Sequence, residues 1–264
     1  MSDAAEAFAE PVLPYIPATG LLARVRRRSA RLLARTPIVP RLERGLVSFT
    51  FDDCPLSAAR NALPLLEARG WRGTLYASMG LNGTTNHLGL HMETEDYVAA
   101  SRAGHEIGDH TYSHMDGMRA GVGMMRADIH RNRAAFREAG LPEATTFAYP
   151  YGEVTPELKR ALWPDFALLR GIHTPADETL DLSLAASQRL YSADMDDVMT
   201  AVERAAEHKL WLILFTHDVR DAPSEFGCTP GEFAAVVEAV ESRNLDVLPV
   251  AQALDLARPE AATA

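Results

Sequence analysis

Cysteine is scarce in this chain, and long hydrophobic runs are absent from it. The 264 residues include two cysteines, which excludes the disulfide-dense scaffolds of small secreted proteins. No window contains the ~18 consecutive apolar residues that a membrane-spanning helix needs. Residues 1–20 mix acidic residues and prolines with small apolar ones. We therefore expect no signal peptide and a cytoplasmic location.

Basic residues are also in deficit. The chain has 26 Lys and Arg against 36 Asp and Glu, a net charge of −10, which argues against a nucleic-acid-binding protein because such proteins usually carry a basic face. The 47% hydrophobic and 23% charged residues are typical of a globular protein. A chain of this length buries a substantial core.

One segment departs from this acidic balance. Residues 24–44 contain eight arginines and a single acidic residue, Glu43, with leucines and a valine interleaved between them. One interpretation is an amphipathic helix that attaches to an anionic membrane surface or to an acidic partner. The other is a solvated helix whose leucines pack on the rest of the protein, and the sequence favours this one because charge runs usually form solvated faces.

From residue 46 onward, strand and helix patterns alternate. Short apolar runs rich in β-branched and aromatic residues predict strands at 46–51, 73–78, 105–109, 145–150, 166–171, 188–192, 211–216 and 245–250. Helical spacing with terminal glycines predicts helices at 57–69, 93–103, 121–139, 155–162, 194–208 and 230–243. This alternation predicts a mostly parallel sheet in one barrel-like α/β domain over residues 45–264, with residues 1–44 as an N-terminal extension.

Reactive side chains follow three of the predicted strands. In (β/α) barrels the carboxyl ends of the strands form the active site, so a shared location is expected for Asp52, Asp53, His110, His114, His217 and Asp218. A lone His-x-x-x-His pair is weak evidence for a metal, but the three strand ends together support one. Cys54 and Cys228 fall in loops at the same end, as a disulfide or as two free thiols.

Four motifs in this order carry a resemblance to a known family. The stretches SFTFDD, HTYSH, FAYPYGE and LILFTHDV, spread over residues 46–219, resemble the successive motifs of the polysaccharide deacetylases, also called NodB-homology or carbohydrate esterase family 4 proteins. The resemblance implies a distorted (β/α) barrel of the NodB type. It also implies one divalent metal, most often zinc (with cobalt or another divalent ion as alternatives), and removal of acetyl groups from N-acetylated amino sugars.

The resemblance also implies roles for individual residues. It makes Asp53, His110 and His114 the metal ligands, Asp52 the general base, His217 the general acid, and the backbone N–H of Tyr151 an oxyanion donor. The residue types suit this chemistry, because a catalytic metal needs three protein ligands and an open position. A histidine titrating near neutrality suits protonation of the leaving amine.

The chain departs from the family pattern at two points. Where the family often has Arg-Pro-Pro-Tyr-Gly, this chain has an alanine, Ala148, in place of the arginine. We expect Arg170 to supply the missing cation, and Tyr149 to line a sugar groove beside Tyr151. The carboxylate that supports His217 is not identified by a motif, and the candidates are Asp165, Asp194 and Asp218, of which Asp218 is also a candidate substrate contact.

The predicted substrate is an N-acetylated amino-sugar polymer, a bacterial exopolysaccharide similar to poly-N-acetylglucosamine. Two alternatives stay open. The same fold serves hydrolases of other small amides, such as a cyclic imide, or a carbohydrate-binding module without activity. The sequence does not identify the polymer's length or linkage, or the metal used.

Overall fold

A curled parallel sheet forms the centre of the protein in the computed structural model, which describes residues 19–175 and 178–258. The strands lie in the order β10-β11-β2-β3-β6-β7-β8, and β12 pairs with β2 as well. Their bounds are β2 (Leu46–Asp52), β3 (Thr74–Ala77), β6 (Glu106–Asp109), β7 (Thr146–Ala148), β8 (Leu168–Arg170), β10 (Gln188–Arg189), β11 (Trp211–Thr216) and β12 (Asp246–Val247). Every pair in this sheet is parallel.

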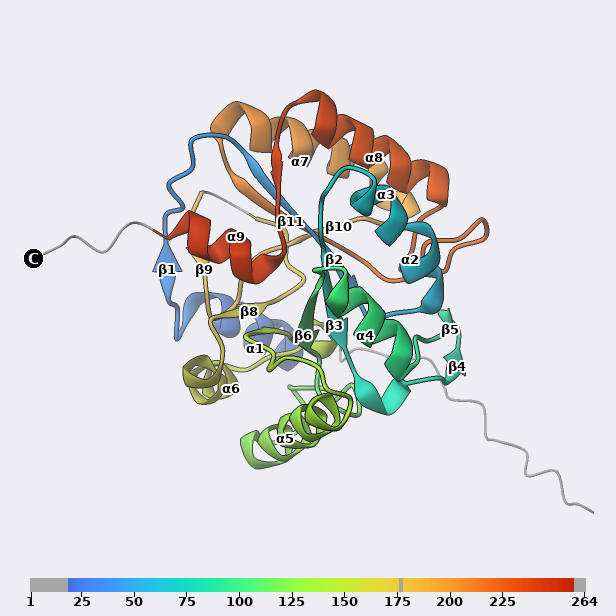
Figure 1. Cartoon of the computed structure of the whole chain (residues 1–264). Helices are drawn as coiled ribbons and strands as arrows, with labels where there is room; N and C mark the ends of the chain where they lie inside the picture. Colours follow the sequence, from blue (N-terminus) through green and yellow to red (C-terminus); the bar gives the residue numbers. More distant parts are fainter. Residues whose placement is uncertain (1–18, 176–177, 259–264) are drawn as a thin grey trace, which may run out of the picture.

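The sheet closes into a distorted barrel through an irregular segment. Ala185 accepts a hydrogen bond from the backbone of Gly171 and donates one to Leu169, so this segment continues the ladder beyond β8. A few residues later, Gln188 pairs with Leu214 of β11. The helices lie outside the curled sheet (Figure 1). The predicted fold class, a distorted and mostly parallel barrel, is confirmed.

The helices agree with the expected pattern except at two places. Their bounds are α1 (Leu21–Leu32), α2 (Leu56–Asn61), α3 (Leu63–Glu67), α4 (Thr94–Arg102), α5 (Val122–Glu138), α6 (Pro156–Leu162), α7 (Met195–His208), α8 (Pro230–Ser242) and α9 (Val250–Ala257). The single helix expected at 57–69 is split into α2 and α3, because Pro64 lacks the N–H that a continuous helix needs. The strand expected at 245–250 is short and leads into α9. No helix within the described ranges is long and apolar enough to cross a membrane.

The two ends of the barrel differ in what covers them. The first turn of α9 donates backbone hydrogen bonds to Thr74 and Glu106, the first residues of β3 and β6. Helix α9 therefore covers the amino ends of these strands. The carboxyl ends of the strands lead into loops, as expected for an active-site face.

Two short antiparallel pairs flank the barrel. Strand β1 (Pro37–Ile38) pairs with β9 (Leu180–Asp181), and β4 (Thr85–Asn86) pairs with β5 (Gly89–Leu90). The first pair ties the segment after α1 to the segment after β8, although about 140 positions separate them along the chain.

Helix α1 docks on the protein in a way that the sequence did not indicate. The side chain of Lys159 in α6 donates hydrogen bonds to the backbone carbonyls of Ala30 and Leu33, and Arg27 pairs with Glu153. The buried residues of α1 are two alanines, not its leucines. The expectation that the leucines pack on the protein is wrong, because the close approach to α6 is made by small side chains.

Candidate metal centre

The carboxyl end of β2 presents two consecutive aspartates. Asp52 is the last residue of the strand, and all of the strand's residues are buried. Asp53 follows with a left-handed backbone (φ 58°), a conformation that Asp tolerates better than most residues but that still costs free energy. This change of direction lets both side chains stay at the barrel mouth, although neighbours on a regular strand alternate between faces.

Two histidines reach the same place from the loop after β6. His110 directly follows the strand, and both Thr111 (φ 61°) and His114 (φ 52°) have left-handed backbones. The pair is therefore not on a helix. The loop is held by buried contacts: Ser78 donates to the carbonyl of His110, and Thr111 accepts from the backbone of Met115. The two imidazole centroids lie 4.9 Å apart.

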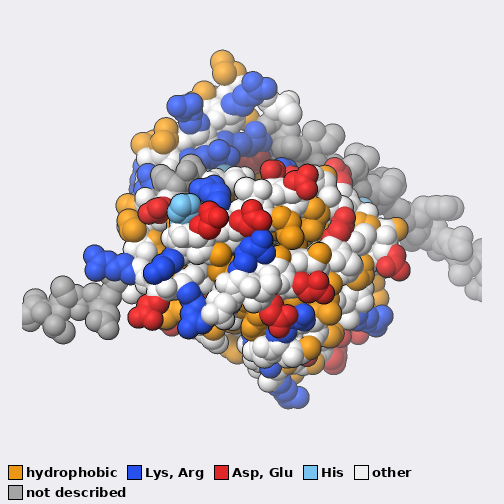
Figure 2. Space-filling view, turned by 90° about the horizontal axis from the view of Figure 1, so that it is seen from above, with side chains coloured by type: hydrophobic (Ala, Val, Ile, Leu, Met, Phe, Trp, Pro, Cys, Tyr) orange, Lys and Arg blue, Asp and Glu red, His pale blue; other side chains and the backbone are white. Residues whose placement is uncertain are grey.

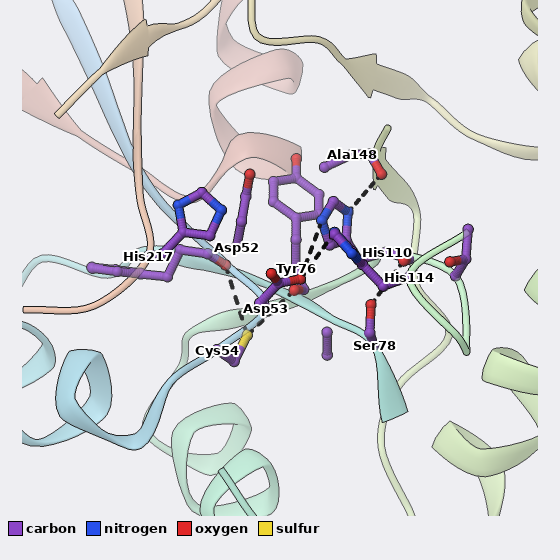
Figure 3. A network of polar contacts seen from close by, with 12 residues as sticks. Asp52, Asp53, Cys54, Tyr76, Ser78, His110, His114, Ala148 and His217 are labelled. Carbon is purple, nitrogen blue, oxygen red and sulfur yellow. Dashed lines mark hydrogen bonds and ion pairs between the residues drawn. The ribbon is translucent and has the colours of Figure 1, made fainter. Parts of the chain in front are cut away.

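The three predicted metal ligands converge on one point (Figure 3). One ligand atom from each of Asp53, His110 and His114 lies within 4.8 Å of the others. The Oδ1 atom of Asp53 is 3.2 Å from Nε2 of His114 and 3.6 Å from Nε2 of His110. His110 Nδ1 lies 2.7 Å from the carbonyl oxygen of Ala148, which places its proton on Nδ1 and leaves a lone pair on Nε2.

One acceptor atom of the cluster has no hydrogen-bond donor. Asp53 Oδ1 is buried and has no hydrogen-bond partner among the residues that the structure describes. Buried polar atoms are rarely left in this state. A carboxylate oxygen facing imidazole lone pairs is stabilised by a cation. One carboxylate and two imidazoles suit zinc and similar divalent metals, so the residues present fit the metal that the sequence motifs imply.

Burial and charge set the protonation of the cluster. Burial lowers the pKa of His114 to about 4 and also lowers the pKa of His110, although Asp53 and Asp52 oppose the shift. Burial alone would raise the pKa of Asp53, but His114 and then His110 outweigh it and lower that pKa to about 2. Those histidines carry charge only in acid, so at neutral pH the cluster is one carboxylate and two neutral imidazoles, the forms that bind metal.

Asp52 has a different partner, Arg170. The guanidinium contacts both carboxylate oxygens of Asp52, and it is fully buried between the rings of Tyr76 and Phe215. Arg170 in β8 is the registered neighbour of Ala148 in β7. The guanidinium that the family pattern would place at position 148 is therefore supplied from the paired position on the next strand.

His217 lies on the other side of Asp52 and Asp53 from the two clustered histidines (Figure 3). It follows β11 directly, and its Nδ1 is 3.2 Å from the carbonyl oxygen of Phe226. That contact holds a proton on Nδ1 and leaves Nε2 as the ring nitrogen not engaged by the carbonyl.

None of the three carboxylates considered as partners of His217 holds its ring. Asp165 pairs with Arg126, Asp194 with Arg189, and Asp218 with Arg220. That expectation is wrong, because the loop after β11 folds back and offers a main-chain carbonyl instead.

Two of the predicted substrate contacts are in the interior. The Tyr149 side chain is 1% exposed, and its hydroxyl donates to the carbonyl of Ser183. Asp218 is 0% exposed and accepts hydrogen bonds from the backbone and hydroxyl of Ser224. Neither side chain is open to a sugar, contrary to the sequence prediction. Tyr151 differs: its ring is 4.2 Å from that of His114, and its backbone is left-handed (φ 59°).

One histidine near the site carries no motif signal. His91 is fully buried, because the chain there bridges to Pro55, two residues after Asp53. Its Nδ1 lies 3.1 Å from the carbonyl of Thr84, and its Nε2 has no hydrogen-bond partner among the described residues. The bridge between residues 91 and 55 places His91 near the site, and no sequence pattern indicates this bridge.

Both cysteines are buried and free, the alternative to a disulfide. The thiol of Cys54 contacts the carbonyl oxygen of Tyr76 at 3.3 Å. Burial raises the pKa of Cys54 well above its usual value, and the neighbouring Asp53 adds to the shift. The thiol beside the ligand Asp53 is therefore protonated and unreactive at neutral pH.

Comparison with known proteins supports the motifs. Residues 40–162 match the family model described as polysaccharide deacetylase. This range includes both aspartates and the two clustered histidines, and it ends before β8 and β11. A segment of 117 residues is 26% identical to a bifunctional xylanase/xylan deacetylase of Cellvibrio japonicus, covering 44% of this chain and 16% of that protein.

A second relative and a solved structure extend the comparison. Over 81 residues the chain is 33% identical to a chitin deacetylase of Colletotrichum lindemuthianum, covering 31% of this chain and 32% of that protein. The matched segments thus span less than a third of the length of either relative. A family 4 acetyl xylan esterase of Clostridium thermocellum, solved with a cobalt ion, has the same fold, with a TM-score of 0.57 and 21% identity over 80% of this chain and 91% of that one.

Proposed function

Since this chain belongs to the polysaccharide deacetylase family, we propose that it is a metal-dependent hydrolase that removes N-acetyl groups from the amino sugars of a bacterial polysaccharide similar to poly-N-acetylglucosamine. The proposal rests on the cluster of Asp53, His110 and His114, in which a buried carboxylate oxygen has no hydrogen-bond donor. A second carboxylate, Asp52, lies beside this cluster and is bound by Arg170. A binding module without activity has no need for a free carboxylate next to a metal site.

The metal site would supply one part of the chemistry. Asp53, His110 and His114 would hold a divalent ion, with zinc as the expected one, and the bound ion would supply polarisation of an acetyl carbonyl and a lowered pKa of a water molecule. The other steps belong to this chain's own side chains and backbone.

Asp52 is the proposed general base. Its carboxylate lies beside Asp53 but is not part of the metal cluster, and Arg170 fixes its orientation. It would accept the proton of the attacking water. Arg170 is a positioning residue in this scheme, because it is fully buried and touches Asp52, not the substrate.

His217 is the proposed general acid. With Nδ1 held by the carbonyl of Phe226, Nε2 would donate a proton to the nitrogen of the departing amine. The backbone N–H of Tyr151 would donate a hydrogen bond to the oxyanion that forms on the acetyl carbon. An amine is a poor leaving group without this proton, so the acid matters more for an amide than for an acetyl ester.

The decisive experiment is acetate release, measured by mass spectrometry, from N-acetylglucosamine oligomers of increasing length. Acetylated xylan and a cyclic imide are the comparison substrates, the first because two of the compared proteins are named for xylan. We expect acetate from the oligomers, with a rate that rises with length. Turnover of xylan or of the imide alone would replace the proposed substrate. No turnover of any of them by metal-loaded protein would favour a binding module.

Two variants test the assigned roles. Asp52→Asn should keep the metal and lower turnover by roughly 10²-fold or more, as expected for a positioned general base. His217→Ala should keep metal and substrate binding while losing the chemical step and the alkaline limb of the pH–rate profile. Loss of metal from Asp52→Asn would show that the two aspartates have been assigned the wrong way round.

A further inference from the structure

Helix α1 presents to solvent the side chains that a helix normally buries. Five of its apolar side chains, or of those at its end, are more than half exposed: Leu21 79%, Leu22 65%, Val25 53%, Leu32 61% and Leu33 51%. Leu21, Val25 and Leu32 are spaced by four and seven residues, so they lie on one side of the helix. The residues buried against the protein, Ala23 and Ala30, are on the opposite side.

Arginines border this apolar face. Arg24, Arg28 and Arg31 are spaced by four and three residues and form a row along one edge of it, and all three are exposed. Residues 19–35 contain six arginines and no acidic residue, in a chain of net charge −10. Figure 2 shows hydrophobic and basic side chains gathered together on the lobe at its upper edge, where α1 lies.

We propose that α1 is a membrane-surface docking helix, whose apolar face enters the headgroup region of an anionic lipid bilayer while its arginines contact the lipid phosphates. A helix with an apolar face, an arginine-rich border and no net burial of that face in its own protein has the character of an interfacial helix. The apolar side chains favour lipid over nucleic acid or an acidic polysaccharide, because neither of those offers an apolar interior to five large side chains. Each arginine near an anionic surface adds about fivefold to the partition coefficient.

The way α1 is attached suits this role. Its opposite side is held by Lys159 in α6, which donates to the carbonyls of Ala30 and Leu33, and by the ion pair of Arg27 with Glu153. The apolar face is therefore presented on a rigid support, and docking does not require α1 to leave the protein.

Docking through α1 would also orient the candidate site. A cavity of about 230 Å³ is lined both by Leu22 and Ala23 of α1 and by Asp116 and Met118 of the loop that begins at His110. Glu153, the partner of Arg27, lies two residues after Tyr151. Helix α1 thus borders the barrel mouth, and docking would bring that mouth close to the bilayer.

The test is sedimentation of the full chain with vesicles of phosphatidylglycerol and phosphatidylcholine, against vesicles of phosphatidylcholine alone. We expect binding to the mixed vesicles that weakens as salt is raised, since exposed charges are screened. Leu21→Glu/Val25→Glu should lower the partition coefficient by more than about tenfold, because two large apolar side chains no longer enter the bilayer. Leu256→Glu, at a half-exposed leucine of α9, is the matched control and should bind as the wild type does.

A second set of variants distinguishes an effect of the α1 arginines from an effect of the protein's net charge. Arg24→Gln/Arg28→Gln should lower partition by roughly 30-fold, whereas Arg102→Gln/Arg204→Gln, with the same net charge but on α4 and α7, should change it little. Thermal melting confirms that each variant is folded. No binding by the wild type, equal binding to neutral vesicles, or equal loss in both charge pairs would overturn the proposal. So would a lipid-free dimer that Leu21→Glu/Val25→Glu dissociates, because the apolar face would then be covered by a second copy.

Discussion

Two buried aspartates in this protein sit in opposite chemical situations. Asp181 is surrounded by donors: its Oδ2 accepts from Lys159 Nζ at 2.9 Å, and its Oδ1 accepts from the backbone of Thr36 and from Ser183. Lys159 uses its remaining two protons on the carbonyls of Ala30 and Leu33. Asp53 is just as buried, yet its Oδ1 faces imidazole nitrogens and has no donor within the described part of the chain.

The difference separates a structural centre from a functional one. At Asp181 every donor and acceptor is matched, so the centre is complete in the folded chain and ties α1, α6 and β9 together. At Asp53 the folded chain assembles acceptors and leaves the cation to come from outside. The backbone conformation differs as well. Of the eight left-handed non-glycine positions in the described residues, five are in the site loops: Asp53, Cys54, Thr111, His114 and Tyr151. Such strain persists where surrounding structure holds it, and it concentrates at functional sites.

Removal of the charge from each aspartate should affect the two centres in opposite ways. Asp53→Asn should reduce bound metal, measured by atomic emission, towards zero and reduce deacetylation to the background rate. Without metal, its melting temperature should be unchanged or higher, because no donor pairs with Oδ1. Asp181→Asn, the control, should keep metal and activity but melt at a lower temperature. A metal-free Asp53→Asn protein that is clearly destabilised would show that Asp53 also has a structural role.

A second test removes the cation that pairs with Asp181. Lys159→Met leaves Asp181 buried without its countercharge, so the free energy of unfolding in urea should fall by about 3–5 kcal/mol. Metal content should not change. Arg160→Met, at the next and exposed position of α6, should have little effect, and Lys159→Met/Asp181→Asn should recover part of the loss. If Lys159→Met is as stable as Arg160→Met, the buried pair contributes no stability.

The smallest expected effect is a pH dependence near the same centre. Burial lowers the pKa of His173 from 6.5 to about 4, with Arg31 adding to the shift and Asp181 opposing it. The unfolded chain therefore binds a proton that the folded one does not between these values, and stability falls as the pH is lowered from 6.5 to 4. His173→Gln should flatten this part of a curve of unfolding free energy against pH. His208→Gln, on the exposed end of α7, should leave it unchanged.

Much of the site could be predicted from the sequence, because its residues directly follow apolar segments that are recognisable as strands. Asp52 and Asp53 follow SFTF, His110 follows EIGD, and His217 follows WLILFT. Parallel strands place their carboxyl ends together, so the convergence of these side chains could be expected without coordinates. The cytoplasmic location, the division at residue 44 and the roles of the site residues stay predictions.

What the sequence alone determined about this protein is the set of local patterns: the alternation of strands and helices, most of their limits, and the order of the motifs. These depend on residues close together in the chain. Packing of the folded chain sets which atoms face one another across long separations in the sequence. It paired Arg170 with Asp52 through the register of β7 and β8, gave His217 a carbonyl in place of a carboxylate, buried Tyr149 and Asp218, and turned the leucines of α1 outward. Each of these depends on packing between distant segments, for which single-chain periodicity carries no signal.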